Sequence, residues 1–555
     1  SASSPSPGTR RSSRSARTRR ASVLPRVRSR SWTYPPKRSS SSVRSSTLLG
    51  VQGKAVDVEI HVGMGLPGFT IVGQPDEACR ESRDRVRAAL LSCDLPWPNR
   101  RITVNLATSV HERKGGAGLD VAIAIGLLIV QDVLPNEIAE RYAFIAELGL
   151  DGTLRPVAGV VPLVAAIDDR IVVVANECER EARIAARDEV VCAQTLAHLV
   201  KCLTGEAAWI PAPTSTQVRT IINAAPPIID MKDVRGQSAA RQALEIAAAG
   251  AHHLLFVGPP GAGKSMLAQR VSGILPVLTD EEAVATTIVH SAAQVSLPQT
   301  GIITLPPFRA PHHSTSLVAM VGGGTSTMRP GEISLATNGV LFLDELGEFA
   351  PTVLDALRQP LEDGVVRLAR AKSSITMPAR FLLIAATNPC PCGEGMPGVC
   401  VCDDSAKKRY LRRFSGPLLD RFDLRVAVSR PHVDELLADT PAESSAAIAK
   451  RVLHVREMAM LRSGCLNSSL SADMLDDFAP LTTSAAALLR YHLERGRLSG
   501  RGYHRIRRVA RTIADLQSAN NPRRENSVDQ VDEAHVATAL ALRVGVHPQL
   551  SGDRL

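Results

Sequence analysis

The chain has 555 residues, with 65 Lys or Arg against 55 Asp or Glu, so its formal net charge is +10. Such an excess usually indicates an acidic partner such as nucleic acid. Here, however, residues 1–50 contain 12 basic residues and no acidic one, and the other 505 contain 53 basic and 55 acidic residues. The hydrophobic content of 44% excludes a wholly disordered chain. No apolar run reaches the roughly 18 residues of a membrane span, so we expect a cytoplasmic protein with no membrane partner.

Residues 1–46 consist mainly of Ser, Arg and Pro, with few large apolar side chains. Such a segment cannot bury enough surface to offset its ordering entropy, so its composition predicts a disordered tail. Three interpretations of the tail stay open: a solvated extension or misassigned start, an arm that binds nucleic acid, and an organelle-targeting peptide.

Ordered patterning follows the tail, and residues 47–205 are predicted to form one α/β domain. Alternating or β-branched runs predict strands, and amphipathic or apolar runs predict helices. The expected elements are a strand within Val56–Ile60, a helix over Glu77–Ser92, a strand over Arg101–Ala107, a helix over Gly118–Val130 and a strand over Ile171–Ala175. A proline-rich stretch then predicts a linker over 206–230.

Residues 231–430 are predicted to form a second α/β domain with a parallel sheet, because helical and strand patterns alternate along it. The expected helices are Ala239–Ala249 and Lys264–Ile274, and the expected strands are Leu254–Val257, Val340–Leu343 and Phe381–Ala386. From 431 to 555 only helical patterns remain, which predicts a helical C-terminal lid. Its expected helices are Val433–Leu437, Ser444–Leu461, Ala472–Phe478, Ser484–Glu494, Tyr503–Leu516 and Val531–Arg543.

The strongest functional signal is a glycine-rich loop between the strand Leu254–Val257 and the helix that follows it. The loop fits the phosphate-binding pattern G-x-x-x-x-G-K-[ST]. Its residues are Gly258, Pro259, Pro260, Gly261, Ala262, Gly263, Lys264 and Ser265. The glycines let backbone amides surround phosphate oxygens, Lys264 adds a cation for the β- and γ-phosphates, and the Ser265 hydroxyl suits Mg²⁺.

Polar residues also follow two other predicted strands. After Val340–Leu343 come Asp344, which suits the Mg²⁺ shell, and Glu345, which suits a base that polarises the attacking water. Asn388 follows Phe381–Ala386, where it could orient that water or contact the γ-phosphate. The alternative for Asn388 is a turn before a proline.

Four of the ten cysteines lie together in a C-x-C-x₇-C-x-C pattern: Cys390, Cys392, Cys400 and Cys402. Four thiolates can close a tetrahedral Zn²⁺ site, although the C-x-C spacing is tighter than the usual C-x₂-C. A structural Zn²⁺ and reduced thiols in a loop therefore both stay open.

Together these segments resemble a known family. Gly258–Ser265, Val340–Glu345 and Thr387-Asn388 resemble the Walker A, Walker B and sensor 1 motifs of an AAA+ ATPase. Longer segments resemble the magnesium-chelatase-like ATPases of the ComM/YifB type: Arg309-Ala-Pro-His-His-Ser314, Val321-Gly-Gly-Gly324, Pro330-Gly-Glu-Ile-Ser334, Asn388-Pro-Cys-Pro-Cys-Gly393 and Ser415-Gly-Pro-Leu-Leu-Asp-Arg421. The resemblance extends from about residue 49 to 543.

The resemblance implies a ring, usually a hexamer, with ATP bound between subunits. Arg421 matches the arginine finger that reaches the neighbour's γ-phosphate, and its alternative is a surface ion pair. Arg501 matches the lid's sensor 2, with Arg508 as its rival. The N-terminal domain resembles a Lon-protease-like module of the ribosomal-protein-S5 type. Lys114 has no serine in the place of a nucleophile, so we expect no peptidase activity.

The family also carries β-hairpin insertions, expected here at about 304–334 and at Val365–Pro378. The second would place Arg367, Arg370 and Lys372 near a tip that faces the central pore of a ring. Cations there would follow a nucleic-acid backbone without reading its sequence. The alternative is a solvated hairpin with ordinary basic residues.

These features are compatible with three functions. The first is a ring motor on single-stranded or branched DNA, similar to a branch-migration helicase acting in natural transformation. The second is a chelatase-like ATPase motor that remodels a protein partner. The third, a nucleotide-gated scaffold without catalysis, is disfavoured because Lys264, Glu345 and Arg421 are all present.

Overall fold

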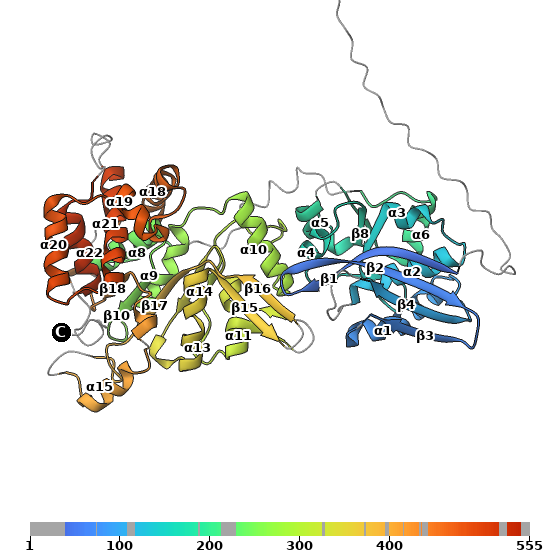
Figure 1. Ribbon diagram of the computed structural model, residues 1–555, viewed down its shortest axis with the longest axis horizontal. Coiled ribbons are helices and arrows are strands. Elements are labelled where there is room, and N and C mark those ends of the chain that lie inside the picture. Colours follow the sequence, from blue (N-terminus) through green and yellow to red (C-terminus); the bar gives the residue numbers. More distant parts are fainter. Residues whose placement is uncertain are drawn as a thin grey trace, which may run out of the picture.

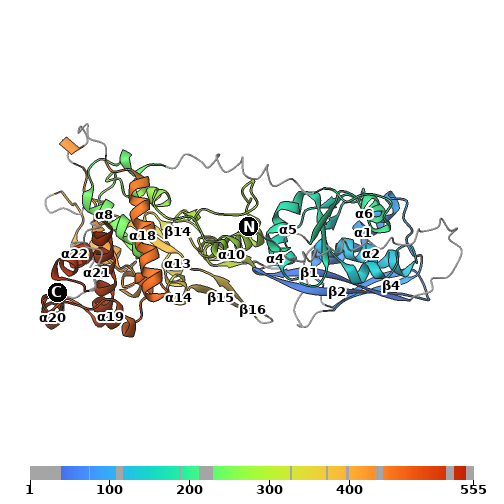
Figure 2. The same cartoon turned by 90° about the horizontal axis from the view of Figure 1, so that it is seen from above.

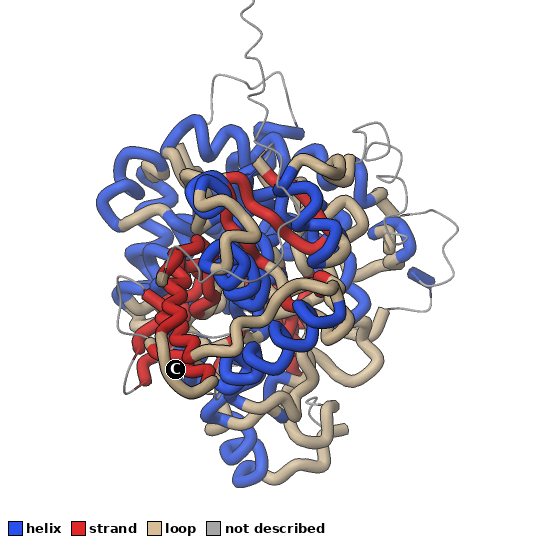
Figure 3. The backbone as a smooth tube through the Cα atoms, turned by 90° about the vertical axis from the view of Figure 1, so that its right-hand side faces the viewer, coloured by secondary structure: helices blue, strands red, loops and turns tan. Residues whose placement is uncertain are grey.

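The computed structural model describes residues 39–73, 75–107, 117–186, 189–211, 229–324, 328–370, 373–394, 399–414, 416–431, 434–435, 442–520 and 530–544. The molecule is elongated, with an N-terminal domain, a central domain and a helical C-terminal part in a row (Figure 1). Figure 3 views the molecule along its long axis, with the N-terminal domain nearest the viewer. Within the described segments, no helix is long and apolar enough to cross a bilayer.

The N-terminal domain is built on a seven-stranded mixed sheet in the order β3-β4-β2-β1-β5-β8-β9. The strands are β1 (Ser40–Leu49), β2 (Gln52–Gly63), β3 (Gly68–Val72), β4 (Arg101–Ala107), β5 (Tyr142–Ile145), β8 (Ile171–Ala175) and β9 (Val190–Ala193), with β6 (Glu147–Leu148) and β7 (Leu154–Arg155) paired separately. The helices are α1 (Glu77–Ser92), α2 (Asp120–Val130), α3 (Glu137–Arg141), α4 (Val160–Ala165), α5 (Glu179–Ala186) and α6 (Leu196–Thr204). The apolar helix α2 is buried along its whole length, in the core beneath the sheet.

The first strand corrects one expectation. The prediction of a disordered tail over residues 1–46 is wrong for residues 40–46, which pair with β2 in an antiparallel ladder. Serines fit this strand because their buried hydroxyls donate hydrogen bonds to carbonyls of neighbouring elements: Ser41 to Gly126 at 2.9 Å, Ser45 to Phe144 at 2.7 Å and Ser46 to Leu163 at 2.8 Å. Residues 1–38 lie outside the described part of the chain.

The central domain contains a five-stranded sheet in the order β11-β14-β17-β10-β18, with every neighbouring pair parallel. The strands are β10 (Leu254–Val257), β11 (Phe308–Arg309), β14 (Val340–Leu343), β17 (Leu382–Thr387) and β18 (Leu424–Ala427). The predicted parallel sheet is confirmed. Sequence patterns did not predict β11, which has only two residues, or β18, in which the buried Arg425 interrupts the apolar run.

Helices pack on both faces of this sheet, and two small hairpins are inserted between its strands. The helices are α8 (Ser238–Gly250), α9 (Lys264–Gln269), α10 (Asp280–Ala292), α11 (Leu317–Val321), α12 (Glu332–Leu335), α13 (Pro351–Ala356), α14 (Arg358–Asp363), α15 (Asp404–Leu411) and α16 (Gly416–Leu419). The hairpins are β12 (Gly322–Gly323) with β13 (Arg329–Pro330), and β15 (Val365–Arg370) with β16 (Ser373–Pro378). Each of the two expected insertions therefore contains one antiparallel pair.

The C-terminal part consists of helices that share a hydrophobic core with one face of the central sheet. They are α18 (Ser445–Ser463), α19 (Ala472–Phe478), α20 (Thr483–Glu494), α21 (Gly500–Asn520) and α22 (Glu533–Val544). Five of the six expected lid helices thus appear close to their expected bounds. Of the sixth expectation, Val433–Leu437, only Asp434 and Glu435 are described, and both are helical. Most of the expected linker 206–230 falls outside the described residues.

The N-terminal and central domains meet at the tip of the β1–β2 hairpin. Leu48, Leu49 and Val51 in this turn belong to one apolar cluster with Ile375 and Met377 of β16. Gly50 at the turn has φ +63°, and a Cβ on it would lie 2.6 Å from Ile375 Cγ2. Figure 2 shows the β15–β16 hairpin extending from the central domain toward this turn.

An internal ion pair gives a test of the N-terminal core. Asp120 at the start of α2 is fully buried and accepts hydrogen bonds from Arg85 Nε at 2.7 Å and Arg85 Nη2 at 3.2 Å. We expect Asp120→Ala to lower the free energy of unfolding by about 3 kcal/mol, because it leaves the largely buried Arg85 guanidinium with only the exposed Glu81 carboxylate as counter-ion.

Urea unfolding followed by tryptophan fluorescence measures this loss, because Trp32, Trp97 and Trp209 are the three tryptophans of the chain and all precede the central domain. The matched control is Asp57→Ala, which removes the more exposed Arg44–Asp57 pair and should cost less than about 1 kcal/mol. If Asp120→Ala and Asp57→Ala lowered the free energy of unfolding by the same amount, the structural role of Asp120 would be contradicted.

Candidate functional site

The glycine-rich loop leaves the carboxyl end of β10 and leads directly into α9. Gly261 and Gly263 have φ values of +74° and +87°, which side chains rarely adopt. Gly258 lies so close to β18 that a Cβ on it would be 2.1 Å from Val428 O. The loop therefore needs glycine at these positions, and α9 begins at Lys264 with its free amides directed toward the loop.

Lys264 is turned back onto this loop. Its Nζ donates to Gly258 O at 2.6 Å and to Pro259 O at 2.9 Å, and also to Asn388 Oδ1 at 3.1 Å. Burial lowers the pKa of the Lys264 ammonium below its usual value, while the nearby Asp344 and Glu345 carboxylates oppose the shift. The structure thus brings together Lys264, in the segment that follows β10, and Asn388, which follows β17.

The two residues expected at Mg²⁺ also meet. Ser265 Oγ donates to Asp344 Oδ2 at 2.5 Å, and the second oxygen of Asp344 accepts from the Glu345 amide at 2.9 Å. A hydroxyl and a carboxylate are the oxygen donors that Mg²⁺ prefers beside substrate phosphates. The residues present therefore fit this ion, and Ser265 and Asp344 are the groups that would hold it.

Glu345 takes an unusual backbone conformation, with φ +50° in the left-handed region. Its Oε2 lies 3.0 Å from Nδ1 of His313, and more than half of its carboxylate side chain is exposed. Such strain in a non-glycine residue persists where the surroundings hold it and is often found at functional sites. His313 was quoted only as part of the motif Arg309–Ser314, and the sequence alone gave no sign that it contacts Glu345.

Arg421 lies at the opposite edge of the same sheet. β10 and β18 are parallel, with Leu254 opposite Leu424 and Val257 opposite Ala427. Arg421 precedes β18, whereas the glycine-rich loop follows β10. The paired part of the two strands therefore separates Arg421 from the loop by roughly 10 Å along the strand direction. The Arg421 guanidinium forms an ion pair with Glu362 and donates to Pro417 O at 2.9 Å.

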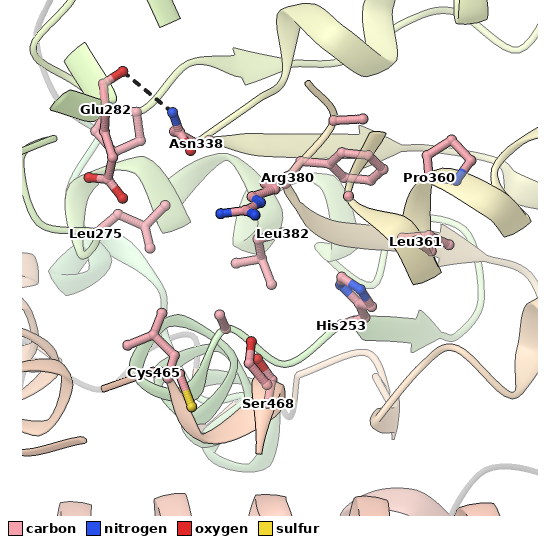
Figure 4. A pocket seen from close by; sticks show the side chains of 18 of the residues that line it. His253, Leu275, Glu282, Asn338, Pro360, Leu361, Arg380, Leu382, Cys465 and Ser468 are labelled. Atoms are coloured by element: carbon pink, nitrogen blue, oxygen red, sulfur yellow. Dashed lines mark hydrogen bonds between the residues drawn. The ribbon is translucent and has the colours of Figure 1, made fainter. Parts of the chain in front are cut away.

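A cavity of about 870 Å³ opens beside Arg421 at this amino-terminal edge of the sheet (Figure 4). Five arginines line it: Arg380, Arg421, Arg456, Arg505 and Arg508. Arg380 extends its guanidinium toward the middle of the cavity (Figure 4). Burial lowers the pKa of Arg456 to about 10 and also lowers that of Arg508, because a charged guanidinium is poorly solvated there. An arriving anion would relieve both shifts.

The cavity also distinguishes the two sensor 2 candidates. Arg508 lines it, and the Arg508 Nε is buried without a hydrogen-bond partner. Arg501 is exposed in the first turn of α21, about two helical turns from Arg508, and does not line the cavity. Of the two candidates, Arg508 is therefore the one that lies beside Arg421 in this cavity, whereas Arg501 does not.

The expected DNA contacts are described only in part. Arg367 on β15 is half exposed and forms an ion pair with Asp363, whose pKa this hydrogen bond lowers. The Arg370 side chain and Lys372 lie outside the described part of the structure, as does Lys114 of the N-terminal domain.

The four clustered cysteines are brought together as expected. Their Sγ atoms all lie within 4.8 Å of one another. Hydrogen bonds from the Glu394 amide and from Cys390 lower the pKa of Cys392 to about 6. Against a hydrogen bond from the Cys392 amide, the pKa of Cys402 is instead raised by burial and by its side-chain hydrogen bonds with Cys392 and Cys400. The four thiols therefore do not share one tendency to ionise.

Comparisons with known proteins agree with this arrangement. Three family models match the chain. The model described as subunit ChlI of Mg-chelatase matches residues 58–177. The model described as magnesium chelatase, subunit ChlI, matches residues 230–436, and the model of the ChlI C-terminal part matches residues 442–543. The competence protein ComM of Haemophilus influenzae is 43% identical over 508 residues, covering 91% of this chain and 97% of that protein. The uncharacterized protein YifB of Escherichia coli is 41% identical over 491 residues, covering 87% and 94%. Lon protease 2 of Bacillus subtilis is 29% identical over 186 residues, covering 29% and 33%.

The two central residues of this site should separate binding from hydrolysis. Lys264→Ala removes the cation for the phosphates, so we expect loss of nucleotide binding. Glu345→Gln keeps the shape of the side chain but cannot polarise water, so ATP should bind while kcat falls at least about 100-fold. Fluorescent-nucleotide binding and phosphate release measure the two effects, and undiminished turnover in either variant would refute the assignment.

Proposed function

Because the chain belongs to the ComM/YifB family of magnesium-chelatase-like AAA+ ATPases, we propose that it is an ATP-driven ring motor acting on DNA. Its work would be that of a branch-migration helicase on single-stranded or branched DNA in natural transformation and recombination. The observation that supports a ring is the placement of Lys264 and Arg421 at opposite edges of one parallel sheet, because the two residues could then act on one nucleotide only if they came from neighbouring subunits.

Within one subunit, the carboxyl edge of the sheet supplies the groups for nucleotide binding and water activation. Backbone amides of the glycine-rich loop would bind the phosphates, and Lys264 would exchange its carbonyl partners for phosphate oxygens. Mg²⁺ held by Ser265 and Asp344 would neutralise charge on the β- and γ-phosphates. Glu345 would accept a hydrogen bond from the attacking water, with His313 holding its carboxylate and Asn388 placed beside the lysine.

Lys264 and Mg²⁺ would be the cations of this set, and a further arginine would neutralise the charge that develops on the outer phosphate during transfer. Arg421 and Arg508 lie at the far edge of their own subunit's sheet, away from its glycine-rich loop. Arg421 would therefore serve the nucleotide of a neighbouring copy, as an arginine finger, and Arg508 would join it as sensor 2. Two features support this role: both line the same cavity, and the Nε atoms of both are buried without a hydrogen-bond partner. A nucleotide bound between subunits makes hydrolysis depend on assembly, for which we propose a homo-hexamer.

DNA is proposed as the track because of the β15–β16 hairpin and the similarity to a competence protein. Arg367, Arg370 and Lys372 would follow the phosphate backbone through the pore. A protein-remodelling motor is the second candidate, favoured by the magnesium-chelatase models that match all three parts of the chain. The proposed ions are Mg²⁺ and a structural Zn²⁺ in the four-cysteine cluster, and the proposed location is the cytoplasm.

DNA stimulation of the ATPase decides between these two candidates. We expect single-stranded and branched DNA to raise kcat, and the triple variant Arg367→Ala, Arg370→Ala, Lys372→Ala to keep basal turnover but lose the stimulation. The matched control is Arg490→Ala, which removes another exposed arginine paired four residues away, with Glu494. A turnover unaffected by either DNA would favour the protein-remodelling motor.

Mixing two inactive variants tests action across the subunit interface. Arg421→Ala alone should lower kcat by about 10³-fold, as expected for loss of an arginine finger. Lys264→Ala subunits still carry Arg421, so a mixed ring contains interfaces in which one subunit binds ATP and the other supplies the arginine. Partial recovery of phosphate release on mixing is therefore expected, whereas no recovery would place Arg421 in its own subunit's site or in a structural role.

A further inference from the structure

The cysteine cluster has the dimensions of a tetrathiolate metal site. Cys390 Sγ lies 3.3 Å from Cys392 Sγ and 3.6 Å from Cys400 Sγ, and Cys392 Sγ lies 3.7 Å from Cys400 Sγ. Four sulfurs bonded to one Zn²⁺ at 2.3 Å are about 3.8 Å apart in a tetrahedron. A disulfide would require about 2 Å, and none joins any of the ten cysteines, all of which the structure describes.

The donor set also selects the kind of ion. Four sulfurs without an oxygen or nitrogen ligand favour Zn²⁺ over Mg²⁺ or Ca²⁺, which prefer oxygen. The Cys392 amide donates to Cys402 Sγ at 3.4 Å, and such a bond stabilises a thiolate. Four protein ligands leave no open position for water or substrate, so the site would be structural.

The cluster lies next to the phosphate loop. Cys390 comes two residues after Asn388, which bonds Lys264. Gly393, with φ +88°, lies against Pro260 so closely that a Cβ on it would be 2.7 Å from Pro260 Cδ. The segment that begins at Cys390 therefore contacts the loop that would bind the phosphates.

The other end of the segment returns to the same sheet. Asp403, directly after Cys402, caps α15 by accepting a hydrogen bond from the Ala406 amide at 2.6 Å. Tyr410 of this helix has its hydroxyl 3.0 Å from Thr387 Oγ1, at the end of β17. An ion shared by both cysteine pairs would therefore join the segment after Asn388 to the helix that packs behind it.

We propose that a Zn²⁺ ion bound by Cys390, Cys392, Cys400 and Cys402 holds this segment against Pro260, and that its presence sets the affinity of the chain for ATP. The coupling rests on the proposed function of the phosphate loop as an ATP site, whereas the metal site does not. Without the ion, no metal–sulfur bond would join Cys390 and Cys392 to Cys400 and Cys402, so Gly393 would no longer be held against Pro260.

The metal is tested first on the full-length protein without nucleotide or DNA. Elemental analysis should find one zinc per chain, and Cys390→Ser or Cys402→Ser should lose it. Cys93→Ser, a partly buried cysteine of the N-terminal domain, is the matched control and should keep it. Zinc should also be present in Lys264→Ala, so a failure of the metal site is distinguishable from a failure of the ATP site. The proposal would be overturned if no zinc were found, or if iron were found in place of zinc.

The coupling is tested by nucleotide affinity. Zinc is removed with a chelator under reducing conditions, the chelator is removed, and Mg²⁺ is restored. The Kd for ATP should rise about tenfold, which is within the usual range for coupled sites, and should return on adding stoichiometric Zn²⁺ but not more Mg²⁺.

A variant that keeps the metal separates this coupling from unfolding. Gly393→Ala should retain one zinc but weaken ATP binding, because its Cβ displaces Pro260. Gly205→Ala is the matched control: Gly205 has φ +78°, yet a Cβ on it would meet nothing within 4 Å. Unchanged ATP affinity both after zinc removal and in Gly393→Ala would overturn the coupling even if the zinc is present. These measurements use the wild type and glycine variants, so they decide the question even if the cysteine variants aggregate.

Discussion

The parallel direction of the five central strands is the constraint on which the rest of the site depends. Because β10, β14 and β17 run the same way, the residues that follow them meet at one edge, where Lys264 contacts Asn388 and Ser265 contacts Asp344. The same direction places the residues that precede β18, including Arg421, at the other edge. A single antiparallel strand at β18 would have brought the arginine and the glycine-rich loop together. The sheet thus holds the glycine-rich loop and Arg421 apart within a single chain.

Burial explains why the arginines at the second edge matter more than the overall charge. The excess of basic residues lies in the first fifty positions, whereas Arg456 and Arg508 lie in a cavity where desolvation lowers their pKa values. His253 in the same cavity has its pKa lowered to about 4 by burial, so it adds no positive charge near neutral pH. A poorly solvated guanidinium interacts more strongly with a nearby charge than an exposed one does, because water does not compete for it. The cavity also contains carboxylates, of which Glu362 and Asp423 each pair with another of its arginines.

Motifs and regular patterns predicted most of the fold and the site. The sequence placed β4, β8, β10, β14, α1 and α19 at their observed bounds, because each combines a clear period with a clear end. The glycine-rich loop and the carboxylates after β14 could be singled out as candidates because each motif is continuous in sequence. His313 was missed because its contact with Glu345 joins residues far apart in the chain, and strand β1 was missed because its serines bond distant carbonyls. The choice between Arg501 and Arg508 likewise required the position of α21 against the sheet.

The packing of the β15–β16 hairpin on the N-terminal domain limits how the hairpin can move. On one face of the hairpin, Ile375 and Met377 contact the turn of β1–β2, while on the other Arg367 lies opposite Thr376 and faces solvent. A load applied to the polar face is therefore transmitted through the sheet to the apolar one. Any stroke of the hairpin must either carry the N-terminal domain with it or expose these side chains to water. For the motor that we propose, the distance that this domain can travel, rather than the flexibility of the hairpin, would then set the length of each step.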